Sequence, residues 1–220
     1  MKATVRYVKD EFDNVHENQR GFVIGGGPSL KNLGNKTIEK LKEEVTVGVN
    51  KAYNLFTPTY LLFCDPWFWD NFKHEILNLD SKILCPHTAV PEVDKKEYPK
   101  LNVFKRGSTI VPKSITGNIS TSNNAGTTAL RIANILGLNP VYLLGVDLKP
   151  ENILNREYNF HNDYGVNRYE ELYKAGPEHY EKFSEAFLKT INKMDSRVVS
   201  CSPDSVLNGF ITYKDVEEVL

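Results

Sequence analysis

Cysteine is scarce in this 220-residue chain, and long apolar runs are absent. The three cysteines, Cys64, Cys85 and Cys201, are widely spaced and embedded in apolar segments. Such cysteines are typical of buried free thiols and unlike a disulfide framework or a zinc site. No segment approaches the roughly 20 apolar residues that a membrane span needs, and the N-terminus has no apolar signal segment. We therefore expect a cytoplasmic protein with no integral membrane segment.

An excess of charge of either sign is also missing. The chain has 27 Lys and Arg residues against 28 Asp and Glu residues, which gives a formal net charge of -1. No global electrostatic attraction to nucleic acid is therefore expected. With 40% hydrophobic and 25% charged residues, the chain can bury one substantial core, so we expect a single domain over residues 1–220. Composition leaves the oligomeric state open.

Several familiar catalytic motifs are absent too. The five histidines are scattered, and no pair has zincin-like spacing, so we expect no histidine metal site. No Gly-x-Ser-x-Gly elbow places a serine nucleophile, which argues against a hydrolase. The glycine-rich segment at residues 25–29 is not a Walker loop, because no Gly-Lys-Ser/Thr follows it. It is not a dinucleotide fingerprint either, since Leu30 stands where the third glycine would be.

That glycine-rich segment is nevertheless the most informative one in the chain. An apolar run at residues 21–24 leads into Gly25, Gly26, Gly27, Pro28 and Ser29. A buried strand that ends in such a turn before a helical pattern exposes backbone N–H groups, which attract phosphate. The alternative is a tight strand-to-helix turn with no ligand.

Apolar strand-like runs alternate with amphipathic stretches along most of the chain. This alternation predicts an α/β fold: a single Rossmann-like, doubly wound, mostly parallel sheet with helices on both faces. Helix boundaries carry an uncertainty of about 2–4 residues. The expected strands are 21–25, 45–49, 59–64, 82–85, 101–105, 140–146 and 197–201, and the expected helices are 36–44, 66–78, 124–137, 178–193 and 213–219.

Two segments, residues 106–123 and 148–177, interrupt the alternation. Long irregular insertions in compact domains are usually functional loops or disordered ones. The second segment is too rich in tyrosine, phenylalanine and histidine for a disordered linker. We therefore predict that 148–177 is an irregular lid that faces the substrate, with Tyr158 and His161 as its candidate contact residues.

Polar or small residues follow several of the expected strands. Asn50 and Asp65 end the second and third apolar runs, Asp147 ends the run at 140–146, and Asn124, Ala125 and Gly126 open a helix. Each has an ordinary explanation as a helix cap. Ligands of parallel sheets bind at the carboxyl ends of the strands, however, and all these residues converge there. Together with the glycine turn they predict a nucleotide pocket.

The order and spacing of these segments resemble a known family. The matching segments are Val23-Ile24-Gly25-Gly26-Gly27-Pro28-Ser29-Leu30, Val49-Asn50-Lys51-Ala52-Tyr53, Phe63-Cys64-Asp65-Pro66, Ala125-Gly126, Val141 to Asp147, and His179 at the start of a late helix. This set is similar to that of the bacterial sialyltransferases of glycosyltransferase family forty-two and of related phage and flagellin-glycosylation proteins.

The resemblance implies a function and a site. It implies an inverting transferase that moves a sugar from a CMP-sugar to a glycan acceptor, with no metal or other cofactor. Gly25 to Ser29, Asn50, Asp65 and Asn124 to Gly126 would surround the nucleotide, and His179 would be the base that deprotonates the acceptor. The chain departs from the family at Gly26 and Asp65, where asparagine is common. The family's paired tyrosines are absent just after Asp147, which leaves Tyr158 as a displaced substitute.

Two other function classes stay open. A more distant resemblance to 6-hydroxymethylpterin diphosphokinase-like proteins would make the chain a phosphoryl-transfer enzyme with Mg²⁺ on Asp65 and Asp147, because carboxylates suit a hard cation. The third class is a noncatalytic nucleotide- or sugar-binding module in a phage particle or assembly pathway.

Overall fold

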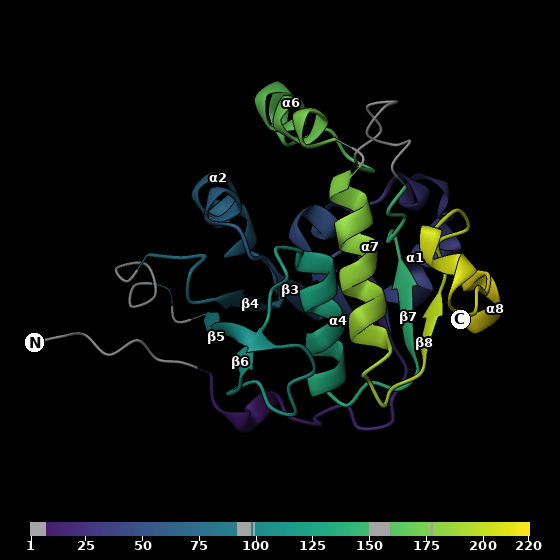
Figure 1. Ribbon diagram of the computed structural model, residues 1–220, viewed down its shortest axis with the longest axis horizontal. Coiled ribbons are helices and arrows are strands. Elements are labelled where there is room, and N and C mark those ends of the chain that lie inside the picture. Colours follow the sequence, from purple (N-terminus) through teal and green to yellow (C-terminus); the bar gives the residue numbers. More distant parts are fainter. Residues whose placement is uncertain (1–7, 92–97, 99, 150–158, 177) are drawn as a thin grey trace, which may run out of the picture.

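Eight parallel strands form one sheet in the computed structural model, which describes residues 8–91, 98, 100–149, 159–176 and 178–220 (Figure 1). The order across the sheet is β6-β5-β4-β3-β2-β1-β7-β8. Every pairing between these strands is parallel. The strands are β1 (Gly21–Ile24), β2 (Val45–Val49), β3 (Tyr60–Leu62), β4 (Lys82–Pro86), β5 (Leu101–Thr109), β6 (Asn118–Ile119), β7 (Val141–Leu144) and β8 (Val198–Ser200).

The strand order reverses beside β1. From β1 the chain builds outward through β2 to β6, and it then returns to place β7 against the other edge of β1. Gly21 accordingly pairs with Val45 on one side and with Val141 on the other. In doubly wound sheets such a reversal opens a crevice at the carboxyl ends of the two diverging strands, which is where ligands bind.

Helices cover both faces of the sheet, as the apolar alternation predicts. Val23 packs in the cluster that includes Leu130 of α4, whereas Phe22 and Ile24 face the other way, toward Leu41 of α1. Figure 1 shows α4 and α7 together over one face, and these two helices contact each other. The helices are α1 (Asn35–Lys42), α2 (Pro66–Ile76), α4 (Ala125–Ile135), α6 (Gly165–Ala175), α7 (Glu178–Ile191) and α8 (Val216–Val219).

Short 3₁₀ helices follow β1, β2 and β8, and another precedes β1. They occupy Asp10–Phe12, Pro28–Asn32, Asn50–Asn54 and Val206–Gly209. The glycine turn therefore leads into a 3₁₀ segment that starts at Pro28, and α1 begins only at Asn35. Helix α1 is thus separated from the glycine turn by seven residues, and the phosphate-binding amides expected there must come from the turn itself.

The predicted fold class is confirmed, and two local predictions are wrong. Within 106–123, β5 continues to Thr109 and β6 pairs with it. Within 148–177, which was expected to be irregular, residues 165–175 form α6. No side chain caps α6 at its N-terminus, and Gly165 and Gly176 flank it with positive φ angles. The usual start signals of a helix are missing there, so its sequence resembles a loop.

The cysteines and the helix lengths bear on the other expectations. None of Cys64, Cys85 and Cys201 forms a disulfide, and Cys85 and Cys201 are buried as predicted. Across the described residues, no helix combines the length and the apolar character that crossing a membrane requires.

Candidate functional site

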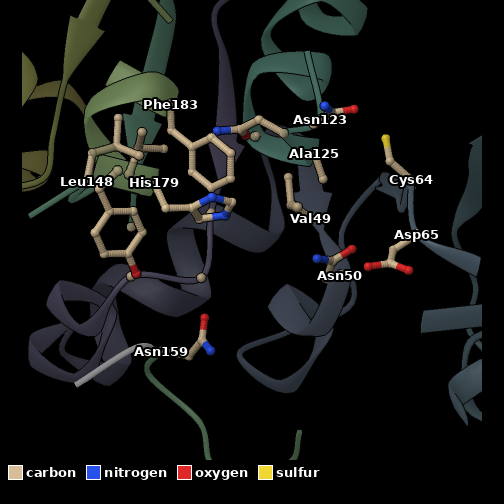
Figure 2. Close-up of a pocket in the computed structure, with 18 of the residues that line it drawn as sticks. Val49, Asn50, Cys64, Asp65, Asn123, Ala125, Leu148, Asn159, His179 and Phe183 are labelled. Atoms are coloured by element: carbon tan, nitrogen blue, oxygen red, sulfur yellow. The ribbon is translucent and has the colours of Figure 1, made fainter. Parts of the chain in front are cut away.

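A cavity of about 460 Å³ lies at the carboxyl ends of β1, β2, β3 and β7 (Figure 2). This is the crevice that the strand reversal between β1 and β7 predicts. Figure 1 shows α6 beyond these strand ends, near the start of α7. Of the residues predicted from sequence, those that line the cavity are Gly25, Gly26, Gly27, Pro28, Asn50, Asp65, Asn124, Ala125, Gly126, Asp147 and His179.

The end of β7 presses closely on the glycine turn. A Cβ atom on Gly25 would stand 2.3 Å from the carbonyl oxygen of Gly145, and one on Gly27 would stand 2.6 Å from the carboxylate of Asp147. These glycines are therefore required by the approach of the protein's own backbone and by the Asp147 side chain. The sequence-based explanation, close approach of a ligand, stays a prediction for the exposed face of the turn.

Asp147 fixes the turn through Ser29. The Ser29 amide donates to Oδ2 of Asp147 at 2.8 Å, and the Ser29 hydroxyl donates to Oδ1 at 2.5 Å. Asp147 lines the cavity, but Ser29 does not. Ser29 was predicted to contact the nucleotide, and in this structure its hydroxyl is engaged by Asp147 instead.

Asp65 has the capping role that its position suggested and a second partner that the sequence did not indicate. As the N-cap of α2 it accepts a hydrogen bond from the Trp67 amide at 2.9 Å through Oδ1. Its other oxygen, Oδ2, accepts from Nη2 of Arg168 in α6 at 2.9 Å, and the Arg168 guanidinium lies over the Trp67 ring, 5.1 Å from its centroid. The negative charge at this strand end is therefore paired with a cation that also lines the cavity.

Asn50 carries strain of a kind seen at functional sites. Its φ angle is 51°, in the left-handed region that few residues other than glycine adopt. Its side chain bonds the hydroxyl of Tyr164. Among the described residues, its buried Oδ1 atom has no hydrogen-bond partner. A buried polar atom without a partner at the wall of a cavity is a candidate contact for a ligand.

The start of α4 is capped from within. Asn124 accepts a hydrogen bond from the Thr127 amide at 3.0 Å, and Gly126 leaves room for Phe187, whose Cζ would lie 3.1 Å from an added Cβ. The ordinary capping role therefore accounts for the Asn124 side chain. Beside it, Arg106 donates to Oδ1 of Asn123 at 2.8 Å, and both of these residues also line the cavity.

His179 is the candidate base. It is the second residue of α7, and its ring packs against Phe183 with centroids 4.2 Å apart. Figure 2 shows the imidazole beside Phe183, across the cavity from Asn50 and Asp65. Burial, with smaller contributions from the charges of Lys182 and Arg168, lowers the pKa of His179 below its usual value. A lowered pKa favours the neutral imidazole, which is the form that can accept a proton.

His161 belongs to the packing of the lid. It is 9% exposed, and its ring contacts those of Phe160 and Tyr164. Burial lowers its pKa to about 4. It does not line the cavity, so its predicted contact with a substrate has no support in the geometry. Tyr158, the other predicted lid residue, lies outside the described residues.

The described part of the lid, residues 159–176, is held to the strand ends at several points. The Phe160 amide donates to the carbonyl oxygen of Gly26 at 3.0 Å. Tyr164 packs edge-on against Trp67, with ring centroids 5.6 Å apart. Lys51, which is only 3% exposed, lies 3.6 Å from a carboxylate oxygen of Asp163. The lid brings cavity residues that were not predicted from sequence: Asn159, Tyr164 and Arg168.

Solved structures with a similar fold come from bacterial transferases. The sialyltransferase CstII from Campylobacter jejuni, in complex with the substrate analogue CMP-3FNeuAc, superposes with a TM-score of 0.57 at 15% identity, over 90% of this chain and 87% of that one. The MAf glycosyltransferase from Magnetospirillum magneticum AMB-1 gives 0.59 at 16% identity, over 93% of this chain but 35% of the larger one. The chain has their fold.

A third solved structure also has this fold, whereas the comparisons with family models and with curated sequences found no match. An alpha-2,3-sialyltransferase from Campylobacter jejuni in apo form matches with a TM-score of 0.51 at 16% identity, over 96% of this chain and 85% of that one. No protein-family model and no curated protein sequence matches the chain. At these identities the likeness establishes the fold, which is the one that the resemblance of the sequence implied.

The lining of the cavity defines what it can do chemically. It offers backbone amides at a glycine turn, an amide oxygen at Asn50, and a neutral imidazole at His179. Its charged groups are balanced, because Asp65 and Asp147 stand against Arg106 and Arg168. Over the described residues, no three or more His, Cys, Asp or Glu side chains gather closely enough to hold a metal ion.

Proposed function

We propose that the protein is a glycosyltransferase that uses a nucleotide sugar, with a CMP-sugar as donor and inversion at the anomeric carbon. One observation carries this proposal: a neutral His179 shares a cavity at the strand reversal with a glycine turn. The fold of CstII, which is solved in complex with CMP-3FNeuAc, supports the choice of donor. The acceptor that we propose is a glycan hydroxyl.

In the proposed reaction, the nucleotide lies along the glycine turn and contacts the free Oδ1 of Asn50. His179 takes the proton from the acceptor hydroxyl, and the oxygen attacks the anomeric carbon. The bond from that carbon to the phosphate oxygen breaks, and CMP leaves with the electron pair. Arg168, which Asp65 holds at the rim, supplies positive charge to the leaving phosphate. General base catalysis of this kind typically contributes about 10²–10⁴-fold in rate.

The alternative of Mg²⁺-dependent phosphoryl transfer gains no support from the geometry. It requires Asp65 and Asp147 as cation ligands. Both carboxylates are already engaged by protein donors, namely Arg168 and the Trp67 amide in one case and Ser29 in the other. The cytoplasmic location, the single domain and the relation to phage proteins stay predictions from the sequence.

Turnover of a CMP-sugar by the His179→Asn variant tests the proposal. With CMP-N-acetylneuraminate as donor and lactose as acceptor, we expect kcat to fall at least about 100-fold, while CMP still raises the melting temperature. His74→Asn, in an exposed histidine of α2, is the matched control and keeps full activity. Unchanged turnover by the His179 variant would refute the base assignment. CMP binding without any turnover by the wild type would instead favour a noncatalytic binding module.

A further inference from the structure

A second concave region of about 470 Å³ lies beside α4 and α7; we call it the hollow. Segments far apart in the chain form it: the end of β5, the loop after β6, α4 and the middle of α7. Three basic side chains line it, Arg131, Lys182 and Lys189, against one acidic side chain, Glu185. The hollow therefore has a formal charge of +2, three cations less one anion, in a chain whose net charge is -1.

Arg131, which lines the hollow, is buried and has no anionic partner among the described residues. It is 1% exposed. Its guanidinium donates to the carbonyl oxygen of Ser120, to the Ser122 hydroxyl at 2.9 Å and to the Thr190 hydroxyl at 2.8 Å. All three acceptors are neutral, and Nε has no hydrogen-bond partner among the described residues. Buried charges are normally paired, so this unpaired guanidinium favours an anion nearby.

Arg131 keeps its charge at neutral pH in spite of this burial. Burial lowers its pKa to about 10, which is still well above 7. Lys182 and Lys189, both exposed, line the same hollow and add to its positive charge. The Ser122 hydroxyl, held by Arg131, lines the same region and supplies a further polar group.

The hollow adjoins the cavity along α7 and the loop before α4. On α7, His179 and Phe183 line the cavity, whereas Lys182 and Lys189 line the hollow. At about 1.5 Å of rise per residue, the ten residues from His179 to Lys189 span about 15 Å. A ligand with its reacting hydroxyl at His179 could therefore extend along the helix toward both lysines.

We infer that the hollow is an acceptor subsite that binds an anionic group, a carboxylate or a phosphate, carried by the glycan. Lys182, Lys189 and the Ser122 hydroxyl bind the anion, and Arg131 holds Ser122 in place and adds positive charge from below. The identification of the ligand as the glycan acceptor rests on the proposed function. The binding of an anion in the hollow does not, because it depends only on these side chains.

Binding of small sugars to the full chain, measured by ligand-observed NMR titration without any donor, tests the inference. The probes are glucuronate, glucose 6-phosphate and neutral glucose. We expect the two anionic probes to bind in preference to glucose, and 0.5 M NaCl to weaken only them. Comparing the affinities for glucuronate and glucose 6-phosphate shows whether the hollow prefers a carboxylate or a phosphate. Inorganic phosphate serves as the anionic probe that carries no sugar.

The decisive variant is Lys182→Gln/Lys189→Gln, since both lysines are exposed and their replacement leaves the fold intact. We expect it to weaken binding of an anionic probe at least about fivefold and to leave glucose unaffected. Lys36→Gln/Lys40→Gln on α1, a pair of exposed lysines outside the hollow, is the matched control and changes neither. Anionic binding that is the same in both double variants would overturn the inference. Loss of donor turnover alone would count against the proposed function and leave the subsite standing.

Discussion

The cavity and the hollow lie next to each other and differ in the balance of their charged side chains. In the cavity, Asp65 is paired with Arg168 and Asp147 with the donors of Ser29. In the hollow, cations outnumber anions, and the hydrogen-bond partners of Arg131 within the described part of the chain are all neutral. The difference indicates a division of tasks: a balanced cavity suits a donor held by amides and a neutral base, and a cationic hollow suits an anion.

Removing Arg168 breaks the charge balance of the cavity and should have the largest effect on binding. Without it, the Asp65 carboxylate is left unpaired beside the phosphate of CMP. We expect Arg168→Met to raise the Kd for CMP about tenfold, because like charges at close range repel and screening inside a cavity is weak. Isothermal titration calorimetry with CMP measures this change in Kd. The control is Arg197→Met, which replaces an exposed arginine.

The second substitution in the same series is Asp65→Asn. Asparagine caps a helix about as well as aspartate, so α2 keeps its N-cap. In the Arg168→Met background we expect Asp65→Asn to recover part of the lost affinity, because the repelling charge is gone while the positive charge of Arg168 is still missing. If the double variant binds CMP no better than Arg168→Met, charge balance is not what the pair contributes.

Acid should lower the free energy of unfolding of the protein through His161. The unfolded His161 titrates near 6.5, whereas the folded residue titrates at about 4 because burial disfavours its charged form. Between these values the unfolded state binds the proton and the folded state does not. The free energy of unfolding therefore decreases as the pH falls from about 6.5 to about 4.

The variant His161→Asn isolates this contribution. Asparagine does not titrate, and its Oδ1 stands where Nδ1 of His161 accepts the hydrogen bond from the Asp163 amide. Melting temperatures recorded from pH 7 to pH 4 should fall less steeply in the variant than in the wild type. Equal slopes would mean that the pKa of His161 is the same in the folded and the unfolded protein. The hollow offers no histidine among its lining residues, so its anion binding should not follow the same titration.

The sheet and the cavity could be predicted because their signals are local. Central strands such as Gly21–Ile24 and Val141–Leu144 are short, nearly continuous apolar runs, as burial on both faces requires. The residue that follows such a strand is then placed at the carboxyl edge by the parallel topology alone. Asn50, Asp65 and Asp147 were found in this way.

The helix within the predicted lid and the partners of the cavity residues could not be predicted, because they depend on contacts distant in sequence. Arg168 and Asp65 are 103 positions apart, and nothing in the spacing near either residue indicates the pair. From the sequence, Gly25 was assigned to the close approach of a ligand, whereas the atom that an added Cβ would meet in the structure is the Gly145 carbonyl oxygen. His161 was expected to face the substrate, and its burial among aromatic rings is likewise a matter of tertiary packing.

Replacing the buried cation of the hollow should change stability least. Arg131→Met removes three hydrogen bonds, but it also removes the cost of burying a guanidinium that has no anionic partner. The Thr190 hydroxyl still donates to the Ala186 carbonyl oxygen at 2.9 Å, and Ser122 is exposed to water. We therefore expect the free energy of unfolding, measured with urea, to change by no more than about 1 kcal/mol, while the stabilisation that wild type gains from glucuronate decreases. A loss of about 3 kcal/mol or more would mean that Arg131 holds the fold together through Ser120 and Thr190, and the contrast between a paired cavity and an unpaired hollow would then lose its functional meaning.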